Sequence, residues 1–268
     1  MPLDLRGARI LVTGASSGIG RSLALALARE GARLALLARR MPLLESLRDE
    51  IVAAGAQAPL LLGADLGEPG AGRQAALEAE AALGGIDVLV NNAGMSITVP
   101  QHLAGDSAEA RRLFETNYWS PLALVAALTP GMRQRGQGVV VNVTSTLQAV
   151  PMPQVGYYCA SKSALSRATQ VMRHELRDHG IRVMEVVPGG TDTETRQQDE
   201  DLPLRPGKKL PKPPLASPTD SARAIVRGLK GQAQRVVYPA TSLLPLEIPV
   251  TGRLIGRLAA GIIDAGAG

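Results

Sequence analysis

A tyrosine and a lysine stand four positions apart in the hexapeptide YYCASK, residues 157–162. Residues i and i+4 of a helix lie on one face, so Tyr158 and Lys162 can face the same space. A phenol donates protons slowly near neutral pH because its unperturbed pKa is about 10, and a nearby ammonium lowers that pKa. The pair is therefore a candidate proton donor, although an exposed pair on an ordinary helix has the same spacing.

A serine precedes this pair at a position that fits carbonyl chemistry. Ser145 stands thirteen residues before Tyr158 and follows the apolar run GVVVNV, which predicts a strand. The oxygen of a carbonyl gains negative charge during reduction, and it needs a proton donor and preorganised hydrogen bonds. We expect the Ser145 hydroxyl to emerge at the end of the strand and to bond the substrate oxygen, the alternative being an ordinary loop hydroxyl.

A glycine-rich turn near the N-terminus suggests a dinucleotide site. TGASSGIG, residues 13–20, lies between the strand-like ARILV and the helical RSLALALARE. Gly14 permits a tight turn, Gly18 lets a pyrophosphate approach, and Gly20 lets the helix pack closely on the strand. Backbone N–H groups at the helix start favour an anion, whereas the alternative reading is a flexible turn. The remaining candidate contacts in this turn are Ser16, Ser17 and Ile19.

The end of the second predicted strand indicates which cofactor is bound. It reads LALLARR, so Arg39 and Arg40 follow Ala38 with no acidic residue among them. An acid here binds the ribose 2′-hydroxyl of NAD, whereas arginine accommodates the 2′-phosphate of NADP. The sequence favours NADP(H), with Arg39 the stronger candidate, over two arginines that are merely solvated at a helix start.

Short apolar runs alternate with helical patterns along the chain. We predict strands at ARILVT, ARLALLA, APLLLGA, IDVLVN, GVVVNV, IRVMEVV and QRVVYP. Buried parallel strands are apolar on both faces, so this alternation predicts an α/β fold. The expected architecture is a doubly wound parallel sheet of about seven strands in a single domain, residues 1–268. The polar, proline-rich residues 191–218 are expected to form a substrate lid after the sixth strand, the alternative being a disordered insertion.

Composition and charge narrow the function classes. The 268 residues are 45% hydrophobic and 20% charged, as in an ordinary globular protein. The net charge is +5, but the arginines are scattered and aromatics make up only 2%, so nucleic-acid binding is not expected. The single cysteine, Cys159, forms no internal disulfide, and the three histidines show no metal-ligand spacing. A strand-like run begins almost at once and no long apolar span is present, so we expect a cytoplasmic location.

The motifs together resemble the short-chain dehydrogenase/reductase family. Its fingerprint has the spacing Gly14-x-x-x-Gly18-x-Gly20 rather than the commoner Gly-x-Gly-x-x-Gly. The resemblance extends through Asp65, NNAG at residues 91–94, Asn117, Ser145, Tyr158-x-x-x-Lys162 and PGGTDT at residues 188–193. It informs little beyond about residue 195, where the family varies.

The resemblance implies a role for each matching position. Tyr158 is the general acid or base, Ser145 orients substrate, Lys162 also contacts the nicotinamide ribose, and Asn117 supports a water-linked proton relay. It places Asp65 and Leu66 by the adenine, and Asn91, Ala93 and Gly94 on the ribose side. Thr193 would reach the nicotinamide amide, with Thr191 the rival for that contact, and Pro188 and Gly189 are further candidate cofactor contacts. Substrate would contact Met95, Ser145, Leu147, Gln148 and Tyr158, with Val150, Met152 and Gln154 also flanking the pocket.

These features predict an NADP-dependent carbonyl reductase or alcohol dehydrogenase. One alternative is a non-catalytic sensor or scaffold that binds NADP(H) with the same fold, although it would not need all four catalytic positions. A nucleotide-sugar epimerase is a third reading, but the chain is short for one and has a different glycine spacing. The substrate class stays open among steroid, fatty-acyl, polyketide and small xenobiotic carbonyls.

The apolar C-terminal tail, residues 239–268, predicts an interaction surface. Leu254, Ile255, Leu258 and Ile262 are spaced for one helix face, with two arginines on another side. Exposed apolar patches usually mark interaction sites. The family resemblance implies a homodimer or homotetramer, formed through the helices that carry Asn117 and Tyr158. The tail would cover a pocket or subunit seam in preference to a membrane.

Overall fold

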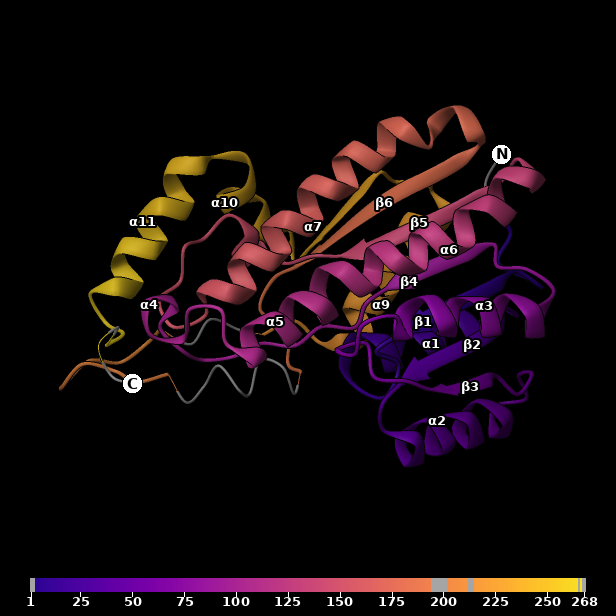
Figure 1. Ribbon diagram of the computed structural model, residues 1–268, viewed down its shortest axis with the longest axis horizontal. Coiled ribbons are helices and arrows are strands. Elements are labelled where there is room, and N and C mark those ends of the chain that lie inside the picture. The colour runs from indigo at the N-terminus through magenta and orange to yellow at the C-terminus, as the bar shows by residue number, and fades with distance from the viewer. Residues whose placement is uncertain (1–2, 194–201, 212–214, 265, 267–268) are drawn as a thin grey trace.

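The computed structural model describes residues 3–193, 202–211, 215–264 and 266. Seven parallel strands form one sheet in the order β3-β2-β1-β4-β5-β6-β7 (Figure 1). The strands are β1 (Arg9–Thr13), β2 (Arg33–Ala38), β3 (Leu60–Gly63), β4 (Val88–Asn91), β5 (Gly138–Val143), β6 (Ile181–Pro188) and β7 (Arg235–Tyr238). The predicted doubly wound parallel sheet is confirmed.

Helices cover both faces of this sheet, which explains why its strands are apolar on both sides. One face packs against α1 (Gly18–Arg29), α2 (Met41–Ala53) and α9 (Pro218–Lys230). The other face packs against α3 (Ala71–Leu83), α6 (Ser120–Arg135) and α7 (Gly156–Glu175). The two cores consist mainly of Ala, Val, Leu and Ile, as the scarcity of aromatic residues requires.

The strand order reverses between β1 and β4, and this reversal determines where a ligand fits. β1 pairs with β2 on one side and with β4 on the other, all in parallel. The chain crosses to opposite faces of the sheet after β1 and β4, which leaves a crevice beyond their carboxyl ends. The glycine-rich turn and the NNAG segment therefore lie next to each other.

Shorter elements lie at the same end of the sheet. They are α4 (Gln101–Ala104), α5 (Ala108–Phe114), a π-helical turn (Glu115–Trp119) and the 3₁₀ turn η2 (Thr146–Gln148). Another 3₁₀ turn (Arg177–His179) precedes β6. Beyond β7 come a 3₁₀ turn (Ala240–Ser242), α10 (Leu243–Glu247) and α11 (Pro249–Ala260), which project beside the sheet (Figure 1).

The predicted lid, residues 191–218, falls partly outside the described residues, at 194–201 and 212–214. Its described parts connect two regions of the fold. Thr191 forms a parallel bridge with Ala216, and Leu204 forms an antiparallel bridge with Ile263 of the tail. The lid segment and the tail are therefore in contact, which the sequence had not indicated.

The tail helix α11 packs on the rest of the chain through its small residues, and most of the predicted apolar stripe faces away from them. Its buried residues are Gly252, Gly256 and Ala259, whereas Leu254 and Leu258 are exposed. The helix ends at Ala260, so Ile262 of the predicted apolar stripe lies in the following turn. Within the described residues, no helix has the length and apolar character that crossing a bilayer requires.

Candidate active site

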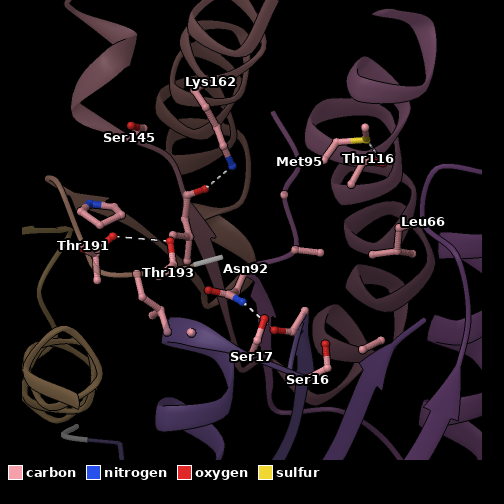
Figure 2. A pocket seen from close by; sticks show the side chains of 18 of the residues that line it. Ser16, Ser17, Leu66, Asn92, Met95, Thr116, Ser145, Lys162, Thr191 and Thr193 are labelled. Carbon is pink, nitrogen blue, oxygen red and sulfur yellow. Dashed lines mark hydrogen bonds between the residues drawn. The ribbon is translucent and has the colours of Figure 1, made fainter. Parts of the chain in front are cut away.

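A cavity of about 380 Å³ opens at the carboxyl ends of the strands around the reversal point. Most of the residues predicted to contact cofactor or substrate line it, and Figure 2 shows several of them. The predicted residues in its walls are Gly14, Ser16, Ser17, Gly18, Ile19, Arg39, Arg40, Asp65, Leu66, Ala93, Gly94, Met95, Ser145, Leu147, Tyr158, Lys162, Pro188, Gly189, Thr191 and Thr193. Seven predicted positions lie outside this lining, namely Gly20, Asn91, Asn117, Gln148, Val150, Met152 and Gln154.

The lysine of the candidate pair is buried beneath the cavity. Lys162 is only 3% exposed, and its Nζ donates a hydrogen bond to the Val143 carbonyl at 2.9 Å. The same nitrogen lies 5.7 Å from the centroid of the Tyr158 ring. Burial lowers the pKa of Lys162 from 10.5 to about 8, so its amine is still mostly protonated at pH 7. Figure 2 shows Lys162 extending from α7 toward the cavity.

Ser145 is the N-cap residue that immediately precedes the turn η2, two positions beyond the end of β5. Its side chain is buried, and its Oγ accepts a hydrogen bond from the Leu147 backbone N–H at 3.2 Å. This contact leaves the hydroxyl proton available for donation to a substrate oxygen. The structure therefore brings Ser145, Tyr158 and Lys162 to one cavity, as their places in the chain had predicted.

Asn117 does not line the cavity but lies buried behind its wall. It lies fully buried within the π-helical turn, a distortion that is frequent at functional sites. Its Oδ1 accepts from the Met95 N–H, and its Nδ2 donates to the Met95 carbonyl, both at 2.9 Å. Nδ2 also lies 3.0 Å from the Ser161 hydroxyl of α7. Asn117 therefore ties the segment after β4 to the helix that carries Tyr158.

The two asparagines of NNAG have different environments. Asn91 lies in the core, where its Nδ2 donates to Asn142 Oδ1 at 2.9 Å, and its side chain is not brought to the cavity. Asn92 lines the cavity and donates to the carbonyls of Thr13 at 2.9 Å and Gly14 at 3.2 Å. Sequence reasoning missed Asn92, although consecutive side chains of a strand point to opposite sides and only one of the pair can face the core.

The glycine-rich turn has the shape that a pyrophosphate group needs. Gly14 and Gly18 have positive φ angles of 65° and 54°. A Cβ on Gly14 would lie 2.8 Å from the Ala93 Cα, and one on Gly20 would collide with the Gly14 carbonyl. The first turn of α1 contains no acidic residue, so its free N–H groups and the helix dipole favour an anion. These residues fit a dinucleotide.

Two arginines border the cavity beyond this turn. Arg40 donates to the hydroxyls of Ser16 at 3.2 Å and Ser17 at 2.9 Å. Arg39 is 59% exposed and lies 3.9 Å from Asp65 Oδ2. Asp65 already pairs with Arg112 and accepts from the Gly67 N–H at 2.9 Å. Arg112, which sequence reasoning missed, therefore neutralises the carboxylate closest to Arg39.

The residues beside Tyr158 mostly have packing roles. Tyr157 is buried, and its hydroxyl donates to the carbonyls of Gly105 and Gln101. Cys159 is half-buried near the Val150 carbonyl, with its sulfur 3.5 Å from that oxygen. Ser161 is buried and donates to the Tyr158 carbonyl at 2.9 Å. Of the hexapeptide, only Tyr158 and Lys162 line the cavity.

The fold and this cavity define a dinucleotide-binding α/β protein with a tyrosine and lysine beside the ligand space. A model of the short chain dehydrogenase family matches residues 8–202, and the chain belongs to this family. The family assignment explains the order of the motifs along the chain. It also makes this chain one of a family of oxidoreductases.

Two curated relatives show how far the similarity extends. The chain is 38% identical over 191 residues to dehydrogenase/reductase SDR family member 7B of Bos taurus, covering 69% of this chain and 58% of the relative. It is 38% identical over 185 residues to a fatty acyl-CoA reductase of Mycobacterium tuberculosis, covering 67% and 62%. The matched region thus spans about three fifths of each of these relatives.

Solved structures are similar over nearly the whole chain. A metagenomic short-chain oxidoreductase in complex with NADP is 31% identical with a TM-score of 0.72, covering 88% of this chain and 98% of that one. A short chain dehydrogenase/reductase from Burkholderia phymatum in complex with NAD has a TM-score of 0.79 over 94% and 97% of the two chains. At 23% identity, the second structure supports the fold alone.

Proposed function

We propose that this chain is an NADP-dependent oxidoreductase that transfers a hydride between nicotinamide and a carbonyl or secondary alcohol. The observation that carries the proposal is the shared cavity. Ser145, Tyr158 and Lys162 line one part of it, whereas the glycine-rich turn and two arginines line another. Proton donation and dinucleotide binding are thereby combined in one space.

In this proposal Tyr158 is the general acid during reduction and the general base during oxidation. NADPH, when bound, supplies the hydride. The Tyr158 hydroxyl donates its proton to the substrate oxygen, and the Ser145 hydroxyl holds that oxygen with a second hydrogen bond. The buried ammonium of Lys162, 5.7 Å from the tyrosine ring centroid, stabilises the phenolate that remains. Asn117 positions these groups by joining α7 to the segment at Met95.

The preference for NADP rests on the charge around the end of β2. Ala38 provides no carboxylate for a ribose hydroxyl, and Arg39 and Arg40 provide two guanidinium groups at the cavity. Because Arg112 pairs with Asp65, the nearest carboxylate competes less strongly for Arg39. A 2′-phosphate would gain charge-assisted hydrogen bonds here. The adenine would lie by Asp65 and Leu66, and the nicotinamide by Thr191 and Thr193.

The pocket beyond the catalytic groups suits an apolar carbonyl compound. Met95 and Leu147 line it, and Leu147 and Met152 also pack against a small core that contains Val155, Leu202 and Ala259. We propose that the lid segment and the tail close this side of the substrate site. Cys159 and Leu210 complete that core, which joins α7, the lid and the tail.

We further propose that the chain forms a homo-oligomer through the helices around Asn117 and Tyr158. Trp119, at the end of the π-helical turn, is 55% exposed, and Val171 of α7 is 47% exposed. Such large apolar side chains favour burial against another surface. The cytoplasmic location stays a prediction from the sequence.

A turnover assay tests the proposed activity. Purified protein is incubated with NADPH or NADH and a panel of aldehydes and ketones of increasing apolar size, and cofactor oxidation is followed. We expect consumption of NADPH with at least one apolar carbonyl, and a higher kcat/KM with NADPH than with NADH. NADPH binding without consumption over the whole panel would instead support the sensor or scaffold function.

A further inference from the structure

The two C-terminal helices and the residue between them carry seven exposed aliphatic side chains, here called the aliphatic face. Its members are 40–70% exposed, and Leu258 is the most exposed of them. An apolar surface of this size on one pair of helices usually marks a site of interaction. The aliphatic face consists of Leu243, Leu244, Ile248, Val250, Leu254, Ile255 and Leu258.

The orientation of α11 is fixed by contacts on its opposite side. Gly252 and Gly256 lie against the backbone of Ala149 and Pro151, in the loop that follows η2. A Cβ on Gly256 would lie 2.6 Å from the Pro151 carbonyl oxygen, so a larger residue would push the helix away. Rotating the leucines inward would bring bulky side chains into this close contact. The packing of Gly252 and Gly256 therefore keeps the aliphatic face on the outside of the protein.

Basic residues border the aliphatic face. Arg253 and Arg257 are exposed on α11 itself. The lid segment 202–211 runs beside the end of the tail, where the Arg205 N–H bonds the Ile262 carbonyl at 2.9 Å, and it adds exposed Lys208 and Lys209.

Acidic residues are few at this end of the described chain. In the tail they are Glu247, which pairs with Arg235 at 2.5 Å, and half-buried Asp264. The helix that carries Arg253 and Arg257 contains no acidic residue.

We propose that the aliphatic face docks on the surface of an anionic lipid bilayer. The aliphatic side chains would enter the headgroup boundary while Arg253 and Arg257 bind lipid phosphates, the pattern of an interfacial amphipathic helix. A two-fold dimer through the same face would present the same arginine-bordered surface on both copies, and like charges near one interface disfavour association. This proposal departs from the sequence expectation, which placed a pocket or subunit seam ahead of a membrane.

Docking in this orientation has a consequence for the cavity. The loop at residues 149–151, on which α11 rests, directly follows the η2 turn that begins after Ser145. The apolar side of the cavity would therefore lie close to the bilayer. The docking itself does not depend on the proposed hydride transfer, so either one can fail without the other.

Vesicle flotation with the full chain tests the proposal. Wild-type protein is mixed with vesicles of phosphatidylcholine containing phosphatidylglycerol, or of phosphatidylcholine alone, at low salt. We expect binding to the anionic vesicles, and the double variant Leu254→Ser/Leu258→Ser should weaken it by about tenfold or more. The variant Arg253→Gln/Arg257→Gln should remove most of the preference for anionic lipid.

A control variant removes two exposed apolar side chains elsewhere on the molecule. Val52→Ser/Leu77→Ser changes two exposed side chains, 47% and 45% exposed, on α2 and α3 and should float like wild type. Thermal unfolding confirms that every variant is folded. The proposal is overturned if wild type does not float with anionic vesicles, or if Leu254→Ser/Leu258→Ser floats equally well. It is also overturned if that variant only converts an oligomer to a monomer.

Discussion

Two neighbouring tyrosines of α7 differ in what their hydroxyls can reach. Tyr158 lines the cavity with Lys162, whereas the Tyr157 hydroxyl bonds the carbonyls of Gly105 and Gln101. The difference follows from the rotation of about 100° per residue along a helix. It supplies a matched pair for testing the proton donor.

Tyr158→Phe should lower the kcat of carbonyl reduction by about 10²–10⁴-fold, because only the donor oxygen is lost. NADPH affinity and melting temperature should stay close to those of wild type. Steady-state kinetics and cofactor titration provide the measurement. Tyr157→Phe is the control and should retain turnover while losing about 1 kcal/mol of stability. Near wild-type turnover by Tyr158→Phe would show that another group donates the proton.

The buried charge of Lys162 should reduce the stability of the cofactor-free protein. Its pKa falls from 10.5 to about 8 on folding, so the unfolded chain binds more protons between these values. The penalty, about 3 kcal/mol at most, is fully present below pH 8 and is relieved as the pH rises toward 10.5. Replacing Lys162 by an uncharged residue would remove this penalty. The same change would lose the hydrogen bond to the Val143 carbonyl, which offsets about 1 kcal/mol of the gain.

The free energy of unfolding of Lys162→Met at pH 7 should therefore be about 2 kcal/mol higher than that of wild type. The advantage should disappear by about pH 10. Denaturant unfolding of both proteins at the two pH values measures this difference. An advantage of equal size at both pH values would contradict the assigned cause. The variant should also lose carbonyl reduction.

Arg39→Asp should shift the cofactor preference from NADPH toward NADH. The change removes a phosphate partner and supplies an acceptor for a ribose hydroxyl, and a charged hydrogen bond of this kind contributes about 1.5–3 kcal/mol. The ratio of kcat/KM for the two cofactors should thus move by about 10–100-fold. Arg73→Asp, on the exposed side of α3, makes the same charge change and should leave the ratio unaltered. A wild type that already prefers NADH would refute the proposed role of the arginines.

At the scale of elements, one buried carboxylate joins β6 to α7 and to the end of β5, the elements that hold the proposed catalytic groups. Glu185 of β6 is 1% exposed and accepts from Ser166 of α7 at 2.7 Å and from Thr144 at 3.1 Å. Arg235 of β7 lies 3.4 Å from its other oxygen. Because Thr144 precedes Ser145, these contacts fix the end of β5 against α7.

Glu185→Leu should lower the free energy of unfolding by about 2–3 kcal/mol, since two buried hydroxyls lose their acceptor and Arg235 loses its partner. Glu185→Gln keeps the shape and an acceptor oxygen, so its loss should be smaller. Denaturant unfolding at pH 7 compares the three proteins. Equal stability of the leucine variant and wild type would mean that these contacts contribute no net stabilisation.

At the scale of the whole molecule, two exposed apolar surfaces lie on different sets of helices. Trp119 is exposed at the end of the π-helical turn that holds Asn117, and Val171 is exposed on α7. The aliphatic face lies on α10 and α11. Figure 1 shows α10 and α11 at the end of the molecule away from α2 and α3. An assembly through the first surface is compatible with lipid docking through the second.

Light scattering after size-exclusion chromatography should give a mass of two or four times 28.0 kDa. Trp119→Asp/Val171→Asp should shift it toward the monomer, because buried charges without partners oppose association. Val52→Asp on α2 adds an exposed charge away from these helices and should keep the wild-type mass. A monomeric wild type at micromolar concentration would remove the proposed assembly.

The sequence by itself determined the sheet, its strands and the positions of the glycine-rich turn and the Tyr158 and Lys162 pair. These features depend on local requirements: apolar runs of strand length, glycine where φ is positive, and the i to i+4 spacing of a helix. Tertiary structure decided which of Asn91 and Asn92 faces the cavity, that Arg112 neutralises Asp65, and how deeply Lys162 is buried. It also turned Leu258 outward by packing Gly252 and Gly256 against a distant loop. Each of these outcomes depends on contacts between residues far apart in the chain, which local sequence patterns do not encode.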